Sequence, residues 1–227
     1  MRRYITVLAA AVTFGAVLAV CKDPAGTSTG VLHDVRATVG NLSTPWLLLP
    51  LLAGSVGRSR TAGALWGLLT TFIGLGAFYV VVGLSIGLDG QRGFAAVPGW
   101  ALANAVYFEA GVVTGPLFGA LGAWWQLRGR RAGRASATRV TRFGWWRVTA
   151  VLLVGEPLVL FLLGYAAPLS ESWRGQLPAL LSLPLMWGRT VDRSVATWVY
   201  AIELGLGVVL LLTAWRRPGI AFHARSS

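Results

Sequence analysis

Apolar segments of helical length alternate with short polar segments along most of the chain. A helix needs about 20 consecutive apolar residues to cross the hydrocarbon core of a bilayer. The pattern predicts transmembrane helices over residues 4–21, 42–56, 61–88, 97–127, 147–167 and 194–215. We therefore expect an all-α, polytopic membrane protein, in which residues 1–227 form one bundle of six transmembrane helices.

Two of these segments depart from the length that a span requires. The segment 42–56 is short and contains Pro50, so it spans only if the preceding residues 37–44 contribute. The segment 97–127 holds about 30 residues, more than a bilayer needs, so it must tilt, kink or protrude. Pro116 supplies a cause for a kink inside it.

The connecting segments differ in charge. The expected outer loops cover residues 22–41, 89–96 and 168–193, and a basic cytoplasmic loop covers 128–146. Within the last outer loop, residues 177–187 are apolar but too short to span, so we interpret them as interfacial or re-entrant.

Composition supports the membrane interpretation. Hydrophobic residues make up 55% of the chain and charged residues 12%, and no soluble core could bury so many long apolar runs. The formal net charge of +12 would suggest nucleic acid in a soluble protein, but here the Arg residues cluster between apolar segments. With both termini cytoplasmic, the inner segments hold fourteen of the twenty Lys and Arg residues, as the positive-inside rule requires. We therefore expect the lipid bilayer, and no nucleic acid, as a partner.

The N-terminal segment has two readings. Arg2 and Arg3 before an apolar run are typical either of a first membrane helix or of a signal peptide. Cys21 adds a lipoprotein alternative, which the preceding Val20 disfavours. We interpret the first helix as retained. Its stripe of small residues, which would allow close helix packing, consists of Ala11, Gly15 and Ala19.

The segment 97–127 carries two distinct features. Asn104, Gly111, Gly115 and Gly119 fall close together at helical spacing, a small-residue pattern that lets another helix approach closely. Glu109 lies off this stripe and is the only charge in the segment. The helix is therefore expected to pack on one side and to present a carboxyl group on another.

Three acidic residues fall inside predicted spans. Glu109, Glu156 and Glu203 lie one each on three successive helices, about 9 to 12 residues from a helix end and so near the bilayer midplane. An intramembrane charge costs about 2.5 to 3.5 kcal/mol on insertion scales. The predicted membrane interior holds no Lys or Arg to compensate it, so the acids should be partly protonated or hold a cation.

These acids allow two interpretations, and both stay open. In one, Glu109, Glu156 and Glu203 line a central binding site with Asn104 and Tyr200, for a proton, a metal cation or a cationic solute. In the other, the acids only form hydrogen bonds that join neighbouring helices. The sequence leaves the ligand, and whether it is a metal, unknown.

Signatures of enzymes and cofactor sites are missing from the sequence. It contains no phosphate-binding loop, no His-Glu-x-x-His motif, no paired cysteines and no Gly-x-Ser-x-Gly motif. We therefore expect no cofactor, no catalytic residue and no enzyme. A membrane enzyme would require His33 and Asp34 to fold back over the outer mouth of the bundle, near the three acids.

Two short motifs carry a resemblance. The run Asn41-Leu42-Ser43-Thr44-Pro45-Trp46, the run from Gly115 to Gly122 and the six-span plan resemble an uncharacterised family of small multi-pass integral membrane proteins from high-GC Gram-positive bacteria. The resemblance implies a bacterial cytoplasmic membrane but carries no function or site residues. More loosely, the small-residue stripe of the first helix looks like that of the substrate-binding subunits of energy-coupling-factor vitamin transporters, where this helix meets a membrane partner.

Two classes of function follow. The first is binding or transport of a small solute or cation through the intramembrane carboxyl groups. The second is a structural or interaction protein, which docks a membrane partner or a second copy of itself through Gly-rich helix faces, or serves as the substrate-binding subunit of a larger transporter.

Overall fold

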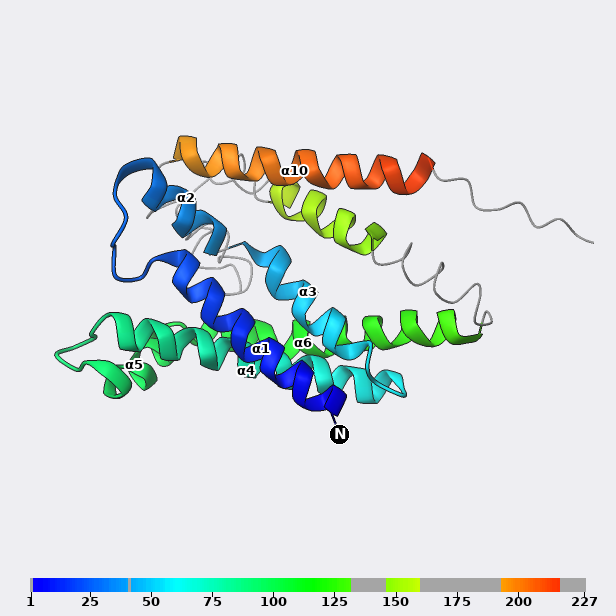
Figure 1. Cartoon of the computed structure of the whole chain (residues 1–227), viewed down its shortest axis with the longest axis horizontal. Helices are drawn as coiled ribbons and strands as arrows, with labels where there is room; N and C mark the ends of the chain where they lie inside the picture. The colour runs from blue at the N-terminus through cyan, green and yellow to red at the C-terminus, as the bar shows by residue number, and fades with distance from the viewer. Residues whose placement is uncertain (1, 41, 132–145, 160–192, 217–227) are drawn as a thin grey trace, which may run out of the picture.

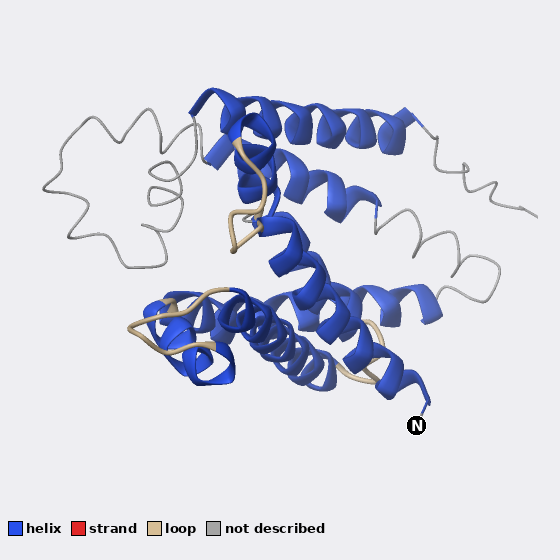
Figure 2. Ribbon diagram, turned by 60° about the vertical axis from the view of Figure 1, so that its left-hand side comes forward, coloured by secondary structure: helices blue, strands red, loops and turns tan. Residues whose placement is uncertain are grey.

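The computed structural model describes residues 2–40, 42–131, 146–159 and 193–216, and their regular structure is helical (Figures 1 and 2). The expected all-α class is confirmed for these residues. The only other feature among them is an isolated antiparallel bridge between Leu88 and Gln91. In chain order, the elements are α1 (Arg2–Lys22), α2 (Gly30–Gly40), α3 (Ser43–Gly54), α4 (Arg60–Ser85), the 3-10 helix η1 (Gly93–Ala96), α5 (Val97–Ala103), α6 (Ala105–Arg131), a helix over 146–159, and α10 (Arg193–Arg216).

Three of the described helices are long and apolar enough to cross a membrane. They are α1, α4 and the part of α6 from Ala105 to Arg128. The helix α3 has 12 residues, and at 1.5 Å per residue it covers about 18 Å of a hydrocarbon core that is about 30 Å thick. In α10, the apolar portion runs only from Thr197 to Thr213. Residues 160–167 of the fifth predicted span, the portion 177–187 and most of the basic loop lie outside the described residues.

The expected outer loop 22–41 is wrong in part, because α2 occupies its second half. The Asp23 carboxylate organises the turn between α1 and α2: it accepts hydrogen bonds from the backbone N–H of Thr27 at 3.0 Å and of Ser28 at 2.7 Å. The Arg36 guanidinium lies 3.5 Å from the Asp23 carboxylate and donates to the Val20 carbonyl at 2.7 Å. Arg36 is thus a second donor to a carbonyl at the end of α1, which also accepts from the backbone N–H of Asp23 at 3.1 Å.

The single helix expected over 97–127 is also corrected, because Asn104 divides it into α5 and α6. The Asn104 side chain donates to the Trp100 carbonyl at 2.9 Å, and its backbone leaves the helical region at φ −121° and ψ 29°. A short amide side chain competes in this way for the backbone groups of a helix. Pro116, the expected site of a kink, lies inside the continuous α6.

The helix α4 is the centre of the packed bundle. It contacts α1, α3 and α6, and α3 also contacts α6. Buried side chains of α1 and α4 form the core between them, with Trp46 of α3 against Phe14 and Phe78. The 146–159 helix and α10 lie side by side in Figures 1 and 2, and Gly207 of α10 faces Val154 at close range. Of these two helices, α10 contacts α2, and the 146–159 helix contacts the start of α3 through Glu156.

Asp23→Asn should loosen the turn between α1 and α2. The side-chain hydroxyls of Ser28 and Thr27, and then their backbone N–H groups, lower the pKa of Asp23 well below its usual range. These hydrogen bonds therefore stabilise the folded protein fully above the unfolded pKa of about 3.9. Their stabilisation is lost as the pH falls through the pKa of Asp23 in the folded protein. We expect amide hydrogen exchange of Thr27 and Ser28 to accelerate roughly tenfold or more, equally between about pH 5 and pH 8.

Asp34→Asn is the matched control, because Asp34 lies on the adjacent α2 and its carboxylate forms no hydrogen bond or ion pair with the described residues. Exchange at Thr27 and Ser28 that is the same in both variants would contradict this account of the turn.

Candidate carboxyl site

The first part of the site is the N-terminus of α3, which a distant carboxylate caps. The N-cap residue Leu42 has no side-chain acceptor for the free N–H groups of the first turn. Glu156 of the 146–159 helix supplies it: its two carboxylate oxygens accept from the backbone N–H of Ser43 at 2.5 Å and of Thr44 at 2.6 Å. A carboxylate at this end of a helix is also favoured by the helix dipole.

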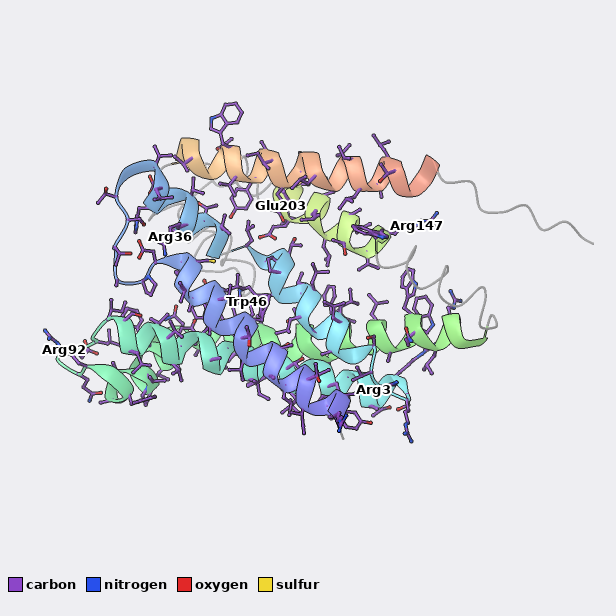
Figure 3. All side chains as sticks on the ribbon, in the orientation of Figure 1. Arg3, Arg36, Trp46, Arg92, Arg147 and Glu203 are labelled. Atoms are coloured by element: carbon purple, nitrogen blue, oxygen red, sulfur yellow. The ribbon has the colours of Figure 1, made fainter. Side chains whose placement is uncertain are left out.

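The second part is Glu203, whose carboxyl group is buried without a hydrogen bond. Glu203 is 4% exposed, and neither carboxyl oxygen has a hydrogen-bond partner in the described part of the chain. The group lies beside the Glu156 carboxyl and the Thr44 hydroxyl, without a well-formed hydrogen bond to either. Figure 3 shows Glu203 on the side of α10 that faces the other helices.

Thr44 and Tyr200 complete the group. Thr44 is 2% exposed, and its hydroxyl oxygen also lacks a hydrogen-bond partner among the described residues. Tyr200 lies one turn before Glu203 on α10, is 9% exposed, and interacts electrostatically with both carboxyl groups. The site therefore combines one satisfied carboxylate, one unsatisfied carboxyl group and two hydroxyl groups, from three elements of the fold.

The structure brings together only part of the residue set proposed from the sequence. Glu156, Glu203 and Tyr200 meet, whereas Glu109 is exposed on α6 and interacts with none of the three. The break at Asn104 explains the difference, because it makes Glu109 the fifth residue of α6 and not the middle of a long helix. Asn104 itself bonds to the Trp100 carbonyl, at the end of α5.

Thr44 is the residue that sequence reasoning missed. Its signal was the start of a helix at Ser43 with an apolar N-cap, Leu42, which leaves the first N–H groups without a local acceptor. The first N–H groups of such a helix need a hydrogen-bond acceptor from another part of the chain. The sequence does not show which of the intramembrane acids supplies it.

The glycines expected to pack another helix lie against α4 of the same chain. A Cβ atom added at Gly111 would lie 3.0 Å from Cγ2 of Thr71, and one at Gly115 would lie 3.0 Å from Cα of Leu68. Gly119 meets both Gly63 and Gly67 of α4. The stripe of α1 likewise faces α4, where Gly15 packs on the backbone of Gly74.

The histidine of the outer segment belongs to the Asp23 turn. His33 Nδ1 lies 3.9 Å from the Asp23 carboxylate, on the link between α1 and α2. Across the described residues, no group of three or more His, Cys, Asp or Glu side chains is placed to hold a metal ion.

Comparison of the chain with protein-family models, with characterised proteins and with solved structures gives no match.

Proposed function

We propose that this chain is a multi-pass protein of a bacterial cytoplasmic membrane that binds a small cation or a proton at the carboxyl pair of Glu156 and Glu203. The three long apolar helices support a place in the membrane. The six-span plan with both termini in the cytoplasm is part of this proposal, supported by the fourteen of twenty Lys and Arg residues that it places inside.

One observation carries the proposed site: the Glu203 carboxyl is buried, has no hydrogen-bond partner within the described part of the chain and lies beside a second carboxyl. A buried charge is costly unless it is paired, and two adjoining carboxylates also repel each other. Glu156 is compensated by two N–H groups of α3, whereas Glu203 has no such partner among the described residues. A bound positive charge at Glu203 removes both penalties.

A structural role is the second candidate, and the capping of α3 by Glu156 favours it. In that role, Glu156 and Glu203 only hold the 146–159 helix and α10 against α3. Docking of a membrane partner through the Gly-rich faces has less support, because α4 covers the stripes of α1 and α6 within the chain. The contact of the α1 stripe with α4 also weakens the resemblance to the vitamin-transporter subunits, in which the first helix contacts a membrane partner.

Thermal stability in detergent tests the proposed function. The full chain is heated over a range of pH values and with a panel of monovalent, divalent and organic cations. A ligand that binds only the folded state at 100 times its dissociation constant adds about 2.7 kcal/mol of stability. We expect one cation, or protons, to stabilise the wild type, and Glu203→Gln to abolish that gain.

Glu109→Gln is the matched control, since Glu109 is an exposed acid on another helix and should leave the gain intact. If neither pH nor any cation changes the stability of the wild type, the binding function is wrong and the structural role stands.

A further inference from the structure

Within the proposed binding function, we infer that the ligand of the pair is a single proton, carried by Glu203 and donated in a hydrogen bond to the Glu156 carboxylate. This inference rests on the proposed function and narrows its ligand. The binding step is the addition of one proton to one carboxylate oxygen of Glu203. It involves no redox change and no other reactant.

Charge is the first argument for one proton. Both Glu156 oxygens accept backbone N–H groups at the start of α3, and these donors stabilise negative charge on this carboxylate. The end of a helix contributes about half a positive charge in addition. Among the described residues, the negative charge on Glu203 has no comparable compensation. A single positive charge, such as a proton, neutralises it.

The available ligand atoms are the second argument. Zinc takes four ligands, and calcium and magnesium take six or more oxygens. In the described residues, the oxygens of this site without hydrogen-bond partners are the two of Glu203 and the hydroxyl oxygen of Thr44. The α3 terminus presents N–H donors, which repel a metal cation and favour an anion. As far as the described residues go, this set is too small for a metal ion and sufficient for a proton.

The surroundings of Glu203 are the third argument. Besides Glu156, the ionisable groups of the described residues that face this part of the site are Tyr200 on α10 and, further off, Tyr107 on α6. On α2, which packs against α10, His33 and Arg36 are directed to Asp23, and Asp34 does not interact with Glu203. Arg147 lies nine residues before Glu156 on the same helix, about 13 Å along its axis. The basic side chains of His33, Arg36 and Arg147 therefore do not compete with a proton for Glu203.

Infrared difference spectroscopy of the full chain tests the inference. Spectra are recorded at acidic and alkaline pH, with and without sodium, potassium, magnesium and calcium salts. We expect a band of a protonated carboxyl group that disappears as the pH rises, is absent in Glu203→Gln, and does not change with the salts. Glu109→Gln should keep the band. Carbon-13 labelling of the glutamate carboxyl groups of the wild type should shift the frequency of this band. The shift tests the inference even if Glu203→Gln fails to fold.

The outcomes separate the two proposals. A pH-dependent glutamate band that is lost in Glu203→Gln supports the proton. If the band is absent but a metal cation stabilises the wild type and not Glu203→Gln, the proton is wrong and the binding function stands. If there is neither a band nor any stabilisation by pH or cations, both are wrong.

Discussion

Gly119→Ala is expected to destabilise the protein by about 3 kcal/mol or more, the upper end of the usual penalty for overpacking. A Cβ atom at Gly119 would lie 2.8 Å from Cα of Gly67 and closer still to the Gly63 carbonyl oxygen. Both neighbours are backbone atoms of α4, which cannot rotate away as a side chain can. Gly54 of α3 packs against the backbone of the same residue, so a shift of α6 away from α4 would also disturb the contact of α6 with α3. Unfolding in detergent measures the change.

Gly76→Ala is the control, because Gly76 also lies inside α4 and an added Cβ would meet nothing within 4 Å. Alanine favours a helix over glycine by up to about 1 kcal/mol, so this variant should be as stable as the wild type or more stable. Equal effects of Gly119→Ala and Gly76→Ala would show that the close contact of α4 and α6 does not exist.

The second large effect concerns Glu156. Glu156→Gln should destabilise the protein by about 2 kcal/mol, the value of a helix cap formed by charged hydrogen bonds. Glutamine keeps one oxygen acceptor but places an N–H group against the second donor, at Ser43 or Thr44. Hydrogen exchange at these two amides should accelerate, and the loss of stability should appear in the same unfolding experiment.

Glu203→Gln is the matched variant of the same pair, with the opposite expectation. It removes a buried carboxyl without a partner among the described residues and supplies an amide that can donate to Glu156, as a protonated Glu203 would. Its stability should equal or exceed that of the wild type. A loss as large as that of Glu156→Gln would mean that Glu203 carries a structural contact of its own.

The two carboxyl groups therefore differ in role although the sequence presents them alike. Glu156 is bound to the end of α3, whereas Glu203, which has no hydrogen-bond partner among the described residues, is the proposed carrier of the proton. Loss of the proton would place two carboxylates side by side and weaken the packing of α10 on the 146–159 helix and α3. If Glu203 carries the proposed proton, stability should therefore fall as the pH rises.

Local pattern was enough for much of the fold. Hydropathy over a window of residues predicted helices at 4–21 and 61–88, and the structure has α1 over Arg2–Lys22 and α4 over Arg60–Ser85. Such a prediction works because the signal lies within the segment itself. The same window could not detect α2, whose apolar content is modest and whose position depends on the contacts of Asp23 and Arg36 with α1.

By itself, the sequence predicted an all-α chain with six transmembrane helices and placed several acids in apolar segments. The described residues are helical, and three of their helices are long and apolar enough to cross a membrane. Only the tertiary structure decided which acids meet. Glu156 and Ser43 are 113 residues apart along the chain, and no local pattern encodes a contact at that distance. It arises because close glycine packing fixes α3 against α4 and α6, which leaves the N-terminus of α3 open to a carboxylate from another helix.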